Sequence, residues 1–174
     1  NEIEQDPNLE MPEKGFAIGF YSNLSWLFNE RAKLLFELEG NSESVQRLFH
    51  SSLEFSQKAE KFNQEIVRQQ PQDIQIKRGY TAGLTNLAIA LYNLGRFDES
   101  SLYLNKSLKL FEEIASFDRQ NVQANLDLAS VYSEFGFLHH KKGDYSSALK
   151  LLERSLQFFD EVIAKDAQNL EAVT

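Results

Sequence analysis

The chain has 174 residues, contains no cysteine, and carries 18 Lys and Arg against 26 Asp and Glu, a net charge of −8. The absence of cysteine excludes disulfides, thiolate catalysis and sulfur-based zinc sites, and the negative charge disfavours nucleic acid and anionic membranes as partners. No apolar run is long enough to span a bilayer and no secretory signal is visible, so we expect a cytoplasmic protein.

Apolar residues recur every three or four positions along almost the whole chain, whereas no stretch alternates with period two for long enough to form a strand. This pattern predicts an all-α fold. The prolines, at positions 7, 12 and 71, stand where helices are expected to begin. The expected helices, in chain order, span about 12–39, 42–69, 72–94, 97–117, 121–142 and 144–165, with a seventh beginning near Asn169.

The later part of the chain repeats itself with an offset of 48 residues. The corresponding pairs are Gly95 and Gly143, Phe97 and Tyr145, Leu104 and Leu152, Ser107 and Ser155, Asp118 and Asp166, and Asn121 and Asn169. The opening Asp6-Pro7-Asn8 looks like the end of one more such unit. Repetition at a fixed spacing is typical of stacked supersecondary units. The predicted unit is a pair of antiparallel helices.

At these positions the sequence resembles the tetratricopeptide repeat family. One repeat matches the family pattern with Tyr132, Phe135-Gly136, His139, Gly143, Tyr145, Ala148, Leu152, Ser155-Leu156 and Asp166. The preceding repeat matches with Leu84, Leu87-Ala88, Leu91, Gly95, Phe97, Ser100, Leu104 and Ser107-Leu108. The family repeat usually has 34 residues, so a repeat of 48 implies helices about two turns longer than usual. The resemblance is strongest over about residues 70–174.

The resemblance implies one tetratricopeptide-like repeat domain over residues 1–174, a right-handed superhelix (an α-solenoid) of antiparallel helix pairs. The expected pairs span about 12–69, 72–117 and 121–165. Both ends of the sequence cut through flanking repeats, and we therefore expect a fragment of a larger protein. Gly136 and Ala88 are expected to face a neighbouring helix, where a larger side chain would separate the helix axes. We expect Trp26 to lie in the core rather than in a groove.

The segment His139-His140-Lys141-Lys142-Gly143-Asp144 is either a chemical site or a helix end. Adjacent histidines project about 100° apart on a helix, so His139 and His140 are poorly placed to chelate one metal ion. We interpret Gly143 as a left-handed helix end and Asp144 as the cap of the next helix. No phosphate-binding, nucleophile-elbow or calcium-binding motif is present. The sequence predicts no metal, no cofactor and no enzyme.

The family resemblance implies that the first helix of each pair lines a concave groove that receives a peptide or partner helix. The residues expected to line this groove are Thr85, Ile89, Tyr92, Asn93, Ser133, Phe137, His140 and Lys141. Ile89 and Phe137 face away from the stripe between the paired helices, so they either bind a partner or are covered by neighbouring helices. The expected function is a non-enzymatic protein–protein interaction scaffold or adaptor. The alternative is a regulatory domain of a signalling protein that senses a ligand or peptide.

Overall fold

The computed structural model describes residues 10–117 and 122–171 of the chain, with side chains through residue 164. All the regular secondary structure in these residues is α-helical. The helices are α2 (Met11–Glu39), α3 (Glu43–Gln69), α4 (Ile74–Asn93), α5 (Phe97–Phe117), α6 (Val122–Lys141) and α7 (Tyr145–Glu171). Helical periodicity thus predicted the elements correctly, and the described ends agree with the expected ones to within two residues except for the last.

The exception is the end of α7, which continues through Glu171 without a break. The expected start of a seventh helix near Asn169 is therefore wrong. The sequence has Asp166-Ala167 at the position where this repeat family ends a helix with proline, and without proline the chain of N–H donors continues. The other expected helix ends, at Asp6-Pro7-Asn8 and at Asp118 to Asn121, lie outside the described residues.

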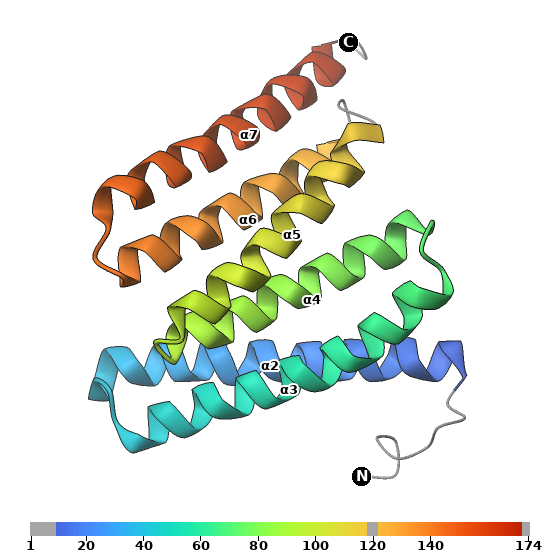
Figure 1. Ribbon diagram of the computed structural model, residues 1–174. Coiled ribbons are helices and arrows are strands. Elements are labelled where there is room, and N and C mark those ends of the chain that lie inside the picture. Colours follow the sequence, from blue (N-terminus) through green and yellow to red (C-terminus); the bar gives the residue numbers. More distant parts are fainter. Residues whose placement is uncertain (1–9, 118–121, 172–174) are drawn as a thin grey trace.

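The helices form three antiparallel pairs, α2–α3, α4–α5 and α6–α7, stacked one on the next (Figure 1). The turn within each pair lies on the same side of the stack, at the left of Figure 1. Each helix packs on its neighbours in the chain, and α4 also contacts α2 and α6. The first helices of the three pairs therefore lie side by side, which is the arrangement of a tetratricopeptide-like helical solenoid.

The turns at Gly95 and Gly143 end α4 and α6 in the same way. Both glycines have positive φ angles, 75° and 80°, which side chains rarely permit. The N–H of Gly143 donates to the carbonyl of His140, and the next N–H, that of Asp144, donates to the carbonyl of His139, both at 2.9 Å. Gly95 and Arg96 make the equivalent pair of bonds. These bonds satisfy carbonyls at the helix ends and confirm the glycine turn.

Small residues bring the helices of each pair close together. A Cβ atom added at Gly136 would lie 2.7 Å from Cγ of Leu152, and Ala88 is completely buried, so both face a neighbouring helix as expected. Hydroxyl groups cross the same interfaces: Oγ1 of Thr85 lies 2.7 Å from Oγ of Ser107, and 48 residues later Ser133 and Ser155 lie 2.8 Å apart. The hydrogen-bonded hydroxyls allow short side chains to be buried without an unsatisfied polar atom.

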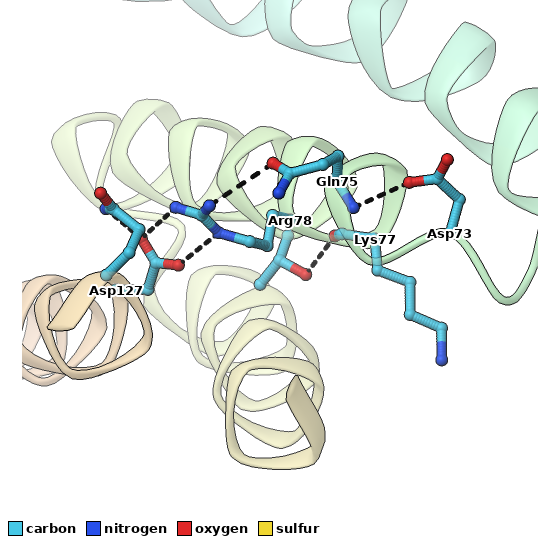
Figure 2. A network of polar contacts seen from close by, with 7 residues as sticks. Asp73, Gln75, Lys77, Arg78 and Asp127 are labelled. Atoms are coloured by element: carbon cyan, nitrogen blue, oxygen red, sulfur yellow. Dashed lines mark hydrogen bonds and ion pairs between the residues drawn. The ribbon is translucent and has the colours of Figure 1, made fainter. Parts of the chain in front are cut away.

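An ion pair joins the first helices of the second and third pairs. The guanidinium of Arg78 on α4 donates from Nε to Oδ2 of Asp127 on α6 at 2.7 Å, and from Nη2 to Oδ1 at 3.2 Å (Figure 2). Gln75 and Asp73 continue this network along α4, where Asp73 caps the helix. The two parallel bonds fix the orientation of the carboxylate as well as its distance.

The outer helices, α2 and α7, keep apolar side chains exposed. Trp26 is 61 % exposed, so the expectation that it lies in the core is wrong. Tyr145, Leu156 and Ile163 of α7 are also exposed. Each of these helices packs on neighbours along only part of its circumference, because it stands at one end of the described stack.

Candidate functional site

A groove of about 590 Å³ opens where the C-terminal turns of α2, α4 and α6 meet, beside the turns within the helix pairs. We use the name groove for this cavity alone. Its lining residues are Lys33, Phe36, Glu37, Asn41, Gln46, Phe49, Tyr92, Asn93, Leu94, Gly95, Phe97, Phe137, His140 and Lys141. The stacking of the three first helices creates it, because their C-terminal ends converge while each chain turns away into its second helix.

Five of the eight residues expected in a groove line this cavity. They are Tyr92, Asn93, Phe137, His140 and Lys141. All five lie within the last turns of α4 or α6, before the glycine turns. The solenoid thus brings together side chains that are 48 residues apart in sequence.

The other three expected residues lie elsewhere. Thr85 is buried, and its hydroxyl is bonded to Ser107 of α5 and to the carbonyl of Thr81. Ser133 is bonded across to α7 in the same way. Ile89 is partly buried and packs on the core formed by α4, α5 and α6, so neighbouring helices cover it. Phe137, in contrast, is 47 % exposed, so neighbouring helices leave about half of its side chain uncovered.

Tyr92, which lines the groove, makes a polar contact between α4 and α6. The hydroxyl of Tyr92 donates a 2.7 Å hydrogen bond to Oε2 of Glu134. Burial raises the pKa of the Glu134 carboxyl, and this hydrogen bond opposes the rise in part. The pKa of Tyr92 is raised too, first by burial and then by the charge of Glu134. Beside it, Asn93 donates to Oδ1 of Asn29 on α2 at 2.8 Å, so polar contacts join all three first helices.

Two lysines, Lys33 and Lys141, also line the groove. Nζ of Lys141 lies 5.9 Å from the centre of the Tyr92 ring, a cation–π distance. Partial burial lowers the pKa of Lys141, and the positive charge of Lys33 lowers it further, which shows that the two ammonium groups face one region. Lys33 is paired with Glu30 at 2.8 Å. Within the described residues no carboxylate pairs with Lys141, so its charge is available to a ligand.

Aromatic rings form the apolar part of the groove. Phe137 of α6 and Phe36 of α2 are both about half exposed, and Phe97 at the start of α5 is partly buried beside them. Aromatic side chains bury large areas and are among those that contribute most to the binding energy of protein interfaces. The groove therefore offers apolar contact and positive charge at the same place.

The histidines at the end of α6 have separate partners. Nδ1 of His139 lies 3.0 Å from Oδ2 of Asp144, and the ring of His140 meets that of Tyr145 edge-on, with the ring centres 5.5 Å apart. Asp144 also accepts from the N–H of Ser147, and its hydrogen bonds to Ser147 and then His139 lower its pKa to about 2. In the part of the chain that the structure describes, no cluster of His, Asp and Glu is arranged to hold a metal ion.

Sequence reasoning missed the contribution of α2 and the partly buried Glu134. Lys33, Phe36 and Glu37 line the groove from a helix that does not align with the 48-residue repeat. A signal for Glu134 was present, since it is an acidic residue three positions before Phe137 on the same helix. Its contact with Tyr92 joins residues 42 positions apart and depends on how the pairs stack.

Comparisons with known proteins identify two segments of the chain. The tetratricopeptide repeat family profile matches residues 82–119 and 128–162, which correspond to most of α4–α5 and of α6–α7. No curated protein matches the chain. None of the described helices combines the length and apolarity needed to cross a bilayer. Tetratricopeptide repeats generally mediate protein–protein interaction and are typically not enzymes. On the two matched segments and the stacked helix pairs, residues 82–119 and 128–162 are similar to tetratricopeptide repeats.

Proposed function

We propose that the chain is a non-enzymatic interaction scaffold, or adaptor, that binds a peptide segment of a partner protein in the groove. The observation that carries the proposal is the position of an exposed Phe137 beside Lys141, whose ammonium has no carboxylate partner in the described structure. The cation–π contact of Lys141 with Tyr92 leaves its N–H donors without a carboxylate acceptor in the described structure. A bound acidic group would complete its interactions.

The chemistry of the groove defines the partner segment. Phe36, Phe97 and Phe137 favour an aromatic or large aliphatic side chain, and Lys33 and Lys141 favour a carboxylate within a few residues of it. Glu37 at the rim and the net charge of −8 disfavour a partner that is acidic along its whole length. We therefore propose a short segment in which one acidic residue adjoins apolar ones, bound by a domain that extends over residues 1–174 in the cytoplasm.

The second candidate is a regulatory domain that senses a small ligand or peptide. One observation favours it: a volume of about 590 Å³ lies within the range of about 300–1,000 Å³ that is usual for small-molecule sites. The scaffold and the sensor differ in the kind of ligand that binds the groove with full affinity. A scaffold binds segments that extend beyond it, whereas a sensor gains its full affinity from a molecule that fits inside.

A peptide-selection experiment tests the proposal. A displayed library of random peptides is selected on the full chain, and the affinity of enriched peptides is measured for the native chain and for Phe137→Ala. We expect at least a tenfold loss with this variant, since central aromatic residues commonly contribute about 2 kcal/mol or more. Lys141→Ala should reduce affinity mainly at low salt, because screening weakens its attraction to the acidic residue.

Leu149→Ala is the matched control, because Leu149 is a similarly exposed apolar residue that lies outside the groove on α7. It should bind the selected peptides with native affinity. Ile89→Ala is unsuitable for this purpose, since Ile89 packs on the core and its loss would lower stability. Equal binding by Phe137→Ala and Leu149→Ala would place the peptide elsewhere and contradict the proposal. Full affinity for a single amino acid or other small molecule would favour the sensor.

A further inference from the structure

α2 carries a second apolar stripe that no other part of the described structure covers. Its residues are exposed to between about half and four fifths of their area, although each is a large apolar side chain. They are Phe16, Phe20, Leu27, Leu34 and Leu38. Successive residues of an α-helix are about 100° apart, so these five positions fall within about 40° of one another. They form one straight line along the helix.

The line lies opposite the face by which α2 packs on the rest of the molecule. The buried residues of that face include Tyr21, Ser25 and Ala32, which project about 140° away from it. At 1.5 Å per residue the stripe is about 33 Å long. A surface helix in a monomer normally has polar residues on the outer side, so apolar residues on both sides indicate that something covers the second one.

The spacing of the stripe is symmetric about Leu27. Phe20 and Leu34 each lie seven residues from it, and Phe16 and Leu38 each lie eleven residues from it. A stripe with this spacing is complementary to itself when two copies run in opposite directions, because every apolar residue then meets an apolar residue. Such self-complementarity is the defining property of an interface with a two-fold axis.

We propose that α2 is a homodimer interface, in which it packs antiparallel against α2 of a second copy of the chain with the two-fold axis at Leu27. Leu27 then lies against the partner's Leu27, Phe20 against the partner's Leu34, and Phe16 against the partner's Leu38. Trp26, one position from Leu27 and also exposed, projects about 100° from the stripe and therefore lies at the edge of the interface.

The dimer leaves the groove open. Lys33 and Phe36 line the groove, and at about 100° per residue they project from other sides of α2 than the stripe does. The stripe is about 33 Å by roughly 10 Å, or on the order of 330 Å² per copy, against about 800 Å² for each partner in a standard stable interface. The net charge of −8 on each copy adds repulsion. We therefore expect a weak association that becomes stronger as salt is added.

Cysteine crosslinking tests the arrangement in the full chain, which contains no cysteine of its own. Leu27→Cys, treated with a short bismaleimide, should form covalent dimers, because the axis brings the two thiols together. Phe20→Cys alone should crosslink poorly, but a mixture of Phe20→Cys with Leu34→Cys should form mixed dimers. Leu149→Cys on α7, 59 % exposed, is the control for random collision.

Sedimentation equilibrium supplies the second measurement. The native chain should show a concentration-dependent dimer, which Leu27→Glu should abolish and Leu149→Glu should leave unchanged. Circular dichroism checks that both variants remain helical, as expected for substitutions at exposed positions. A native chain that stays monomeric at several hundred micromolar overturns the proposal. Crosslinking of Phe20→Cys alone as efficiently as Leu27→Cys would show parallel helices and would also overturn it.

Discussion

Replacing Gly136 by alanine should change the stability of the protein in two opposite ways, through helix propensity and through steric overlap with Leu152. Alanine favours a helix by about 1 kcal/mol relative to glycine, which would stabilise α6. The new Cβ, however, would lie 2.7 Å from Cγ and 2.8 Å from Cδ2 of Leu152, and 3.4 Å from the carbonyl oxygen of Ala148. Ordinary carbon contacts are about 3.5–4.0 Å, so Leu152 or the axis of α7 must move by roughly 1 Å.

Overpacking of this kind costs about 1–3 kcal/mol, which exceeds the gain in helix propensity. We expect Gly136→Ala to lower the free energy of unfolding by roughly 1 kcal/mol, and the melting temperature by about 2–4 °C. Urea denaturation followed by circular dichroism measures the first quantity, and a thermal melt measures the second. Gly136→Leu should be more destabilising than Gly136→Ala.

Gly79→Ala is the matched control, because a Cβ added at Gly79 on α4 meets nothing within 4 Å. This variant should gain about 0.5–1 kcal/mol. In the background of Leu152→Ala, which removes the clashing atoms, Gly136→Ala should lose most of its cost. A Gly136→Ala protein as stable as Gly79→Ala, or a cost unchanged by Leu152→Ala, would refute the close contact between α6 and α7.

Further predictions concern buried and capping groups. Burial raises the pKa of Glu134 above its ordinary 4.5, so stability should fall as the pH rises through the raised value, and Glu134→Gln should flatten this part of a pH series of urea denaturation curves. The pKa of Asp144 is lowered to about 2, so its contribution is complete above about 3.8 and is lost as the pH falls towards 2. Asp144→Ala should remove that dependence from the helix content measured by circular dichroism, and an identical acid profile would contradict the cap. Leu104 is completely buried, so Leu104→Ala should lower the free energy of unfolding by about 2–5 kcal/mol in the same urea assay.

The helices and their turns could be predicted from the sequence because they depend on local patterns. The 3.6-residue stripes located α2 to α7, and Gly95 and Gly143 marked their turns, since a left-handed backbone there depends on one residue type. The small residues Ala88 and Gly136 identified the close interfaces for a similar reason. The end of α7 was mistaken because a family pattern was applied where the proline that enforces it is missing.

The candidate site was less predictable because it depends on how the pairs stack. The 48-residue offset pairs Tyr92 with His140 and Asn93 with Lys141, and all four line the groove. The same reasoning placed Thr85 on that face, but Thr85 is buried and its hydroxyl is hydrogen-bonded to Ser107 of α5. Trp26 was assigned to the core because an apolar stripe shows that a helix face is covered, but does not show whether the cover is the same chain.

The ion pair between Arg78 and Asp127 has a mechanical consequence. It joins α4 to α6 near their N-terminal ends. The hydrogen bond between Tyr92 and Glu134 lies about 14 residues, or roughly 21 Å, further along α4. The two bonds at Arg78 hold the N-terminal halves of the two helices more firmly than the single bond at Tyr92 holds their C-terminal ends. A rotation of about 5° between the two helices at the Arg78 contact would separate their C-terminal ends by roughly 2 Å, about half the thickness of an aromatic ring. The ion pair between Arg78 and Asp127, although far from the groove, would therefore affect how easily the groove widens.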